Sequence, residues 1–244
     1  VVDNTNGKSV YALQKSGAVT APAANYNLHA AMVYSGGAYK ARFAAPFAIL
    51  DSSLHTIETA CQGKKDLTLP LLTINWSVNN KPVSGDKSKG FVGSANHFTV
   101  EKGKPQIYLK GQEDVSTAEY SRHTIAHEFG HYLERSLFRS DTIGGRHAFG
   151  EILNPRTAFG EGYGNGLSGI VWADPIYVAV SGKGQASGFE SDFGVARSGH
   201  DASFHSEMSV AYALYQLWDR RDSKAKSGSF DRIFAVLNGP QRTS

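Results

Sequence analysis

The sequence predicts an α+β protein, with strands concentrated in the first half of the chain and helices in the second. Short apolar runs rich in β-branched and aromatic residues, bounded by Pro, Asn and Gly, occupy 71–78 and 106–109 and are typical of strands. Apolar residues three or four positions apart recur over 46–61, 117–139 and 208–218, as amphipathic helices require. With 41% hydrophobic residues in a chain of 244, there is enough apolar surface to bury a core.

The remaining segments are assigned in chain order. Residues up to about 45 alternate short apolar and polar stretches, which favours short strands and loops. Pro46 opens the first helix, because proline suits a first helical position. We expect a hairpin over 91–100, between the two strands. The Gly/Ser-rich segment 182–199 is expected to be an exposed loop.

One five-residue stretch, His127-Glu128-Phe129-Gly130-His131, carries the strongest chemical signal. Positions i and i+4 of a helix project from the same face, so both imidazoles can reach one ion. Glu128 then lies close enough to take a proton from a water bound to that ion. The stretch therefore predicts a catalytic zinc site with His127 and His131 as ligands and Glu128 as base.

The surrounding residues support a helix over about 117–139. Ser116 and Glu119 have the spacing of a capping box at its start. An apolar stripe follows at steps of four residues and faces away from the two histidines, so the helix should bury one side and offer the other to a cleft. The stripe consists of Ile125, Phe129, Leu133 and Leu137.

A catalytic zinc takes three protein ligands and leaves its fourth position to water, so one ligand must come from elsewhere. The metzincin pattern is excluded, since Glu134 and Leu137 stand where its glycine and third histidine would be. Asp141 and His147 lie in a turn-rich loop over 139–156, which would fix ligand geometry poorly.

Glu161 is the favoured third ligand, with Asp141 and Glu207 as the main alternatives. It begins a second helix candidate near Gly160, and Asn165 lies one turn later on the same face. There the Asn165 side chain can accept a hydrogen bond from the distal nitrogen of a ligating histidine. This helix holds four glycines, each unfavourable by about 1 kcal/mol, which close packing against another helix would offset; they are Gly162, Gly164, Gly166 and Gly169.

Composition excludes several classes of protein. The net charge of +3 comes without long basic runs, so we expect no nucleic-acid partner. Cys61 is the single cysteine, which rules out an intrachain disulfide and a thiolate metal site. No apolar run is long enough for a membrane span. The chain begins without a methionine, and we expect it to be part of a longer protein.

The motif pair resembles the gluzincins, the clan of thermolysin-like zinc peptidases, in which a helical His-Glu-x-x-His is followed by Glu-x-x-x-Asp/Asn on a second helix. More closely, the chain is similar to a group of secreted bacterial gluzincin-like proteins. That similarity rests on 45–51, 75–77, 107–109, the stretch 123–132 and the stretch 158–162. The interval from His131 to Glu161 is long for the clan, and Asn165 replaces an aspartate.

The resemblance implies a zincin-type fold: a single metallopeptidase-like catalytic domain over 1–244, with a β-containing lobe at about 1–115 and a mainly helical lobe at about 116–244. Zn²⁺ would lie in the cleft between them, held by His127, His131 and Glu161. The strand 106–109 would form the sheet edge that pairs with an extended substrate. It further implies a secreted or periplasmic location.

The function expected on these grounds is zinc-dependent hydrolysis of peptide bonds in proteins or peptides, as an endopeptidase and as a monomer. The alternative is a zinc-binding but catalytically silent domain of a larger secreted adhesin or binding protein. Glu128 discriminates between them, since a purely structural zinc site needs no carboxylate there. Spacing does not select the donor for the developing oxyanion, which could be Tyr163, His200, His205, Arg146 or Arg156.

Overall fold

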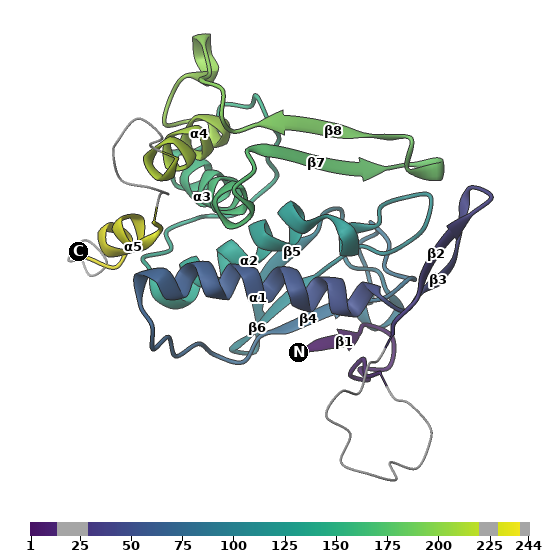
Figure 1. Ribbon diagram of the computed structural model, residues 1–244. Helices are drawn as coiled ribbons and strands as arrows, with labels where there is room; N and C mark the ends of the chain where they lie inside the picture. The colour runs from purple at the N-terminus through teal and green to yellow at the C-terminus, as the bar shows by residue number, and fades with distance from the viewer. Residues whose placement is uncertain (14–28, 220–228, 240–244) are drawn as a thin grey trace.

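The computed structural model describes residues 1–13, 29–219 and 229–239, leaving out the side chain of His200. It has a mixed α+β architecture with a sheet formed by N-terminal segments and a helical C-terminal part, as expected (Figure 1). No helix in the described part of the chain is both long and apolar enough to span a membrane.

The main sheet has four strands in the order β1-β4-β6-β5. Pairing is parallel between β1 and β4 and between β4 and β6, and antiparallel between β6 and β5. The edge strands are therefore β1 and β5. Strand β6, which covers most of the expected edge at 106–109, is an interior strand. The bounds are β1 Val2–Asn4, β4 Thr73–Trp76, β5 His97–Glu101 and β6 Lys104–Tyr108.

The hairpin expected over 91–100 is displaced in the structure. It joins β5 to β6 through a turn at Lys102 and Gly103, both with positive φ. Residues 91 and 92 instead form isolated bridges with Lys81 and Ser84. The sequence pattern identified an apolar run but not its pairing partner, which depends on residues further along the chain.

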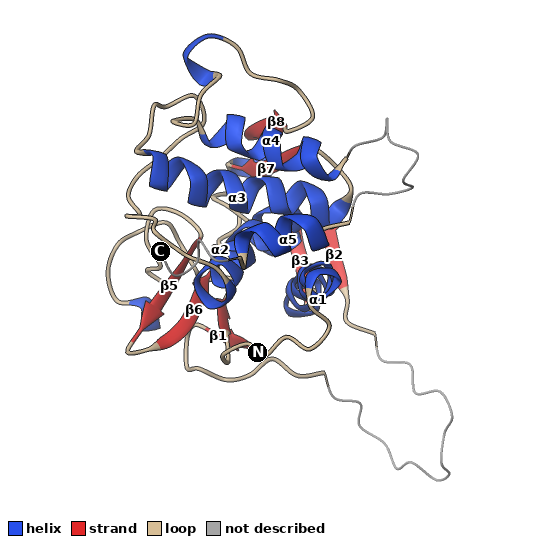
Figure 2. Ribbon diagram, turned by 90° about the vertical axis from the view of Figure 1, so that its left-hand side faces the viewer, coloured by secondary structure: helices blue, strands red, loops and turns tan. Residues whose placement is uncertain are grey.

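Two helices, α1 (Ala45–Gly63) and α2 (Arg122–Leu137), cover one face of the sheet (Figures 1 and 2). The first has proline in its first turn as predicted, but two of its expected apolar core positions are exposed. Leu50 and Leu54 are 42% and 52% exposed, whereas small and hydroxyl-bearing residues such as Ser52, Thr56 and Ala60 are buried. Small residues allow this helix to approach its neighbours closely.

The start of α2 differs from the capping box that the sequence predicts. A 3₁₀ turn (Ala118–Tyr120) precedes the helix, which begins only at Arg122. Glu119 is fully buried and forms an ion pair with Arg42, and its other oxygen accepts a hydrogen bond from Trp76 Nε1 at 3.2 Å. Its carboxylate is thus committed to a tertiary contact. The predicted apolar stripe of α2 is confirmed, with Ile125, Phe129 and Leu133 buried.

Three further helices form the C-terminal part: α3 (Pro155–Trp172), α4 (Glu207–Trp218) and α5 (Asp231–Leu237). The second helix candidate thus starts at Pro155 rather than near Gly160, which places Glu161 in its second turn. The glycines allow the close packing that the sequence predicts. A Cβ at Gly162 would lie 2.4 Å from Val210 Cβ, and one at Gly166 would lie 3.1 Å from Ala211 O, both on α4.

The segment 182–199 is not simply a loop. Its strand β8 (Ser187–Asp192) pairs antiparallel with β7 (Ile176–Ser181) in a hairpin that extends from the helical part past α2 (Figure 1). A second small hairpin is made by β2 (Met32–Ser35) and β3 (Ala38–Arg42). The sequence pattern did not predict β8, because this strand is exposed along most of its length and glycine and serine stand where a half-buried strand would have apolar residues.

Candidate metal centre

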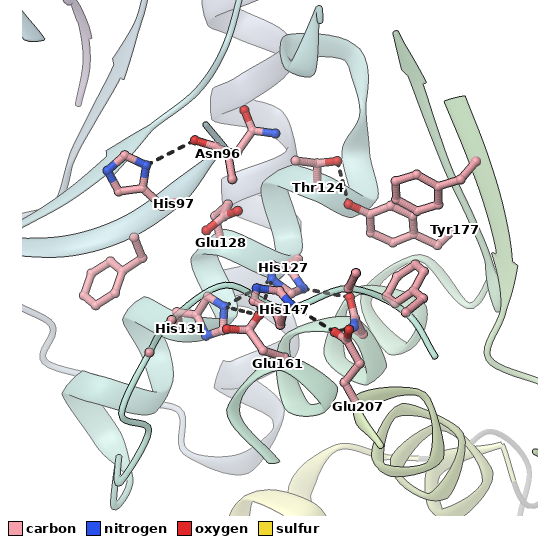
Figure 3. Close-up of a pocket in the computed structure, with 18 of the residues that line it drawn as sticks. Asn96, His97, Thr124, His127, Glu128, His131, His147, Glu161, Tyr177 and Glu207 are labelled. Carbon is pink, nitrogen blue, oxygen red and sulfur yellow. Dashed lines mark hydrogen bonds and ion pairs between the residues drawn. The ribbon is translucent and has the colours of Figure 1, made fainter. Parts of the chain in front are cut away.

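The two histidines of the motif point their rings toward one point beside α2 (Figure 3). His127 and His131 lie one turn apart on the helix, and their Nε2 atoms are 3.1 Å from each other. The structure thus confirms the expectation that i and i+4 imidazoles converge. Their side chains are only 11% and 14% exposed, so the convergence point is largely shielded from solvent.

Glu161 reaches the same point from α3. Its Oε2 lies 3.3 Å from His127 Nε2 and 3.3 Å from His131 Nε2. Two glycines allow the helices to approach this closely: a Cβ on Gly130 would lie 3.2 Å from the Cα of Gly164, and a Cβ on Gly164 would lie 2.9 Å from His127 Nδ1. The absence of side chains at this crossing brings the carboxylate to the imidazoles.

These three atoms fit a zinc ion. Zinc bonds of about 2.0–2.1 Å with tetrahedral angles place neighbouring ligand atoms about 3.3 Å apart. The observed separations of 3.1, 3.3 and 3.3 Å match that value. Glu161 Oε2 is moreover buried without a hydrogen-bond partner, although imidazole nitrogens surround it. A metal ion at the convergence point would give this buried oxygen its missing partner.

A hydrogen-bond chain supports His127 from behind. Its Nδ1 lies 2.8 Å from Oδ1 of Asn165, which is 2% exposed. Asn165 Nδ2 in turn donates to Glu207 Oε2 at 3.1 Å, and Glu207 is 1% exposed at the start of α4. With its oxygen facing the ring, Asn165 fixes the tautomer whose Nε2 lone pair faces the convergence point.

His131 is flanked by a carboxylate on its other side. Glu134, 2% exposed, places Oε2 3.9 Å from His131 Nδ1. Burial by itself lowers the pKa of His131, but Glu134 and Glu161 together raise it well above the usual histidine value. Burial likewise raises the pKa of Glu161, yet its contacts with His127 and His131 lower it well below its usual range. The site therefore favours a positive charge at its centre.

The convergence point opens into a cavity of about 640 Å³. One wall is formed by residues 95–98 at the edge strand β5, and the opposite wall by Phe149, Tyr177 and Phe189. The rings of Tyr177 and Phe189 are stacked at 5.5 Å, with Phe149 edge-on to both. Two charged residues, Glu128 and Lys110, also line the cavity. It thus has an aromatic wall, a strand edge and a floor formed by the converging histidines and Glu161.

Glu128 lies beside the histidines, facing the cavity (Figure 3). Its carboxylate oxygen is within 4.8 Å of a ring nitrogen of His127 and of His131. Desolvation lowers the pKa of Lys110, and the charge of Glu128 opposes this shift. Glu128 is only 6% exposed. The geometry places a second carboxylate next to the two histidines, facing the cavity.

Other residues considered from the sequence lie elsewhere. Asp141 is paired with Arg139 at 2.7 Å and lines a different cavity, which it shares with Tyr163 and Arg156. His205 faces Leu153 O through Nδ1 at 2.9 Å. Arg146 is exposed and His200 has no described side chain. Among the expected oxyanion donors whose side chains are described, none lines the cavity beside the two histidines.

Sequence reasoning missed two residues at the site. The sequence places His147 in a loop that would fix a ligand poorly, yet its Nε2 lies 3.2 Å from Glu161 Oε2. Tyr177 lies on β7, a strand that the sequence pattern does not predict, and its hydroxyl lies 2.8 Å from Thr124 Oγ1 at the cavity wall. No local motif marks either of them. The only available signal for His147 was its position between the motif and Glu161.

Comparison with known proteins bears on the identity of the site. No curated protein and no solved structure gives a significant match to this chain. One family model does match, that of the Mycolysin C-terminal domain, over residues 60–240, a range that includes the motif, Glu161 and Glu207. The chain therefore belongs to the mycolysin family, whose members are thermolysin-like zinc metalloproteases.

Proposed function

We propose that this protein is a zinc endopeptidase in which His127, His131 and Glu161 hold the metal and Glu128 is the general base. The observation that carries the proposal is the convergence of two imidazole nitrogens and one carboxylate oxygen at 3.1–3.3 Å, beside Glu128 in a cavity. When bound, zinc supplies Lewis acidity, polarising a carbonyl and lowering the pKa of bound water.

The chain's own residues supply the remaining chemistry. Glu128 accepts a proton from the attacking water and passes it to the leaving amine. Asn165 and Glu207 keep the His127 ring in the ligating orientation. The low exposure of Glu128 and Glu161 removes most bulk water from the reacting groups, which strengthens the electrostatic interactions among them.

The edge strand β5 is where we place an extended substrate. It borders the cavity through His97 and Phe98 and pairs with β6 on one side only. A peptide added there would form backbone hydrogen bonds, as in β-augmentation. Opposite it, the stacked Tyr177 and Phe189 offer an apolar surface for a substrate side chain. Protein and peptide chains with bulky apolar residues near the cleaved bond are thus the proposed substrates.

Endopeptidase action is favoured over aminopeptidase action by the carboxylates of the cavity. Among the described residues that line it, the acidic ones are Glu128, Glu161 and Glu207. Glu161 faces the imidazoles and Glu207 accepts from Asn165, while Glu128 is the base. None is then left to bind the amino group of a substrate N-terminus. Family membership also supports action outside the cell, where we expect a monomer.

The test compares wild type with Glu128→Gln, which keeps the shape of the side chain. Both should bind zinc equally, because Glu128 is not one of the proposed ligands, and cleavage of casein should fall about 10²–10⁴-fold in the variant. Equal cleavage by both proteins would show that Glu128 is not the base. A zinc-loaded wild type that cleaves nothing would instead favour the silent zinc-binding domain.

A further inference from the structure

The loop between α2 and α3 reaches the metal centre through one side chain. Over residues 141–150 every residue is exposed except His147 and Phe149, which are half-buried and line the cavity. Phe149 packs edge-on against Tyr177 and Phe189. His147 points to the cluster formed by Glu161 and the two motif histidines (Figure 3).

His147 lies about as far from Glu161 as the two motif histidines do. Its Nε2 is 3.2 Å from Glu161 Oε2, against 3.3 Å for both His127 and His131. Three imidazole nitrogens thus surround Glu161 Oε2. Each lies at about the distance that separates two ligand atoms of a tetrahedral zinc ion. His147 thus approaches the same carboxylate oxygen as the two motif histidines.

The other nitrogen of this ring also has a partner suited to a metal ligand. His147 Nδ1 lies 3.5 Å from Glu207 Oε2, the atom that accepts from Asn165. Glu207 is fully buried, and its second oxygen has no hydrogen-bond partner. A ligating histidine is usually oriented by a carboxylate at its distal nitrogen. Glu207 therefore faces His147 directly and supports His127 through Asn165.

We propose that His147 is a fourth, releasable ligand of the metal, oriented by Glu207. The inference rests on the proposed ligand set of His127, His131 and Glu161. Unlike those residues, His147 comes from a loop, and Gly144 and Gly145 just before it have φ of +61° and +112° with open space around them. The loop can change conformation at these glycines, so His147 Nε2 can leave the metal and a water or substrate oxygen can replace it. This ligand exchange transfers no proton or electron.

The test counts the imidazoles around zinc by X-ray absorption spectroscopy on the zinc-loaded full chain. Wild type should show three imidazoles and His147→Ala two, and the variant should bind zinc at least about tenfold more weakly in chelator competition. Arg146→Ala is the matched control, because this neighbour is exposed and does not line the cavity. It should behave as wild type.

Two imidazoles in wild type, with zinc affinity of His147→Ala within twofold, would overturn the inference and leave the proposed peptidase intact. A wild type that binds no zinc would overturn both. Release is tested by adding a peptide hydroxamate, which supplies two oxygens to the metal. The imidazole count of wild type should then fall from three to two, whereas a count that stays at three would show a fixed ligand.

Discussion

Replacing Asn165 by aspartate should destabilise this protein, although related peptidases of the thermolysin-like clan carry aspartate at this position. Asn165 donates through Nδ2 to Glu207 Oε2 at 3.1 Å while its Oδ1 faces His127. In Asn165→Asp the donor becomes a second carboxylate oxygen at the same distance from Glu207. Both groups are at most 2% exposed, so water cannot separate the two charges.

The size of the effect follows from that distance. Two unit charges 3.1 Å apart repel by about 5 kcal/mol at an effective dielectric constant of about 20. Protonating one carboxyl of ordinary pKa near 4 costs about 4 kcal/mol at pH 7 and about 1.4 kcal/mol at pH 5. The folded variant therefore takes up a proton that the unfolded chain does not bind. Its stability relative to wild type should fall as pH rises, by about 4 kcal/mol at pH 7.

Urea unfolding of metal-free wild type and Asn165→Asp at pH 5 and pH 7 measures this difference at each pH. The matched control is the double variant Asn165→Asp/Glu207→Gln, in which the new amide can donate to the new carboxylate. It should recover most of the lost stability at both pH values. The explanation is refuted if Asn165→Asp stays within about 1 kcal/mol of wild type at pH 7 or if the second substitution recovers nothing.

Two further predictions concern the same helices. Gly164→Ala should weaken zinc binding at least about tenfold, because the new Cβ would lie 2.9 Å from His127 Nδ1 and displace this ring. The better helix propensity of alanine does not offset this clash. Unchanged zinc affinity in chelator competition would contradict the prediction. Burial lowers the pKa of His123 to about 4, with Asp174 opposing the shift. Between pH 6.5 and 4 the unfolded chain binds a proton there that the folded protein does not, so stability should fall by about 3 kcal/mol as pH drops. In His123→Gln that part of the pH dependence should vanish from the unfolding free energy, and an unaltered slope would argue against it.

Glu207 gives a physical reason for asparagine at position 165. In this chain the negative charge that supports His127 lies one residue further back, on Glu207, and the Asn165 amide transmits it through two hydrogen bonds. A neutral residue between ring and carboxylate avoids two adjacent buried charges. The same carboxylate also faces His147 Nδ1. Glu207 thereby connects α2, α3, α4 and the loop before α3.

Local sequence was sufficient for features that depend on neighbouring residues along one helix. The spacing of His127 and His131 sets their convergence, because helix geometry alone brings i and i+4 together. The step from Glu161 to Asn165 places a carboxylate and an amide on one face of α3 in the same way. The glycines of α3 predicted close packing, because their unfavourable helix propensity is offset only when another helix packs closely against them.

Only the tertiary structure decided which distant groups meet these helices. Glu119 has the spacing of a helix cap, but it is taken by Arg42, 77 residues away. His147, Glu207 and Tyr177 enter the site from a loop, a helix start and a hairpin that no spacing rule connects. The sequence by itself determined the two helices that carry the proposed ligands, since their geometry is local. The position of His147 and the walls of the cavity depend on how separate segments pack, which local pattern does not encode.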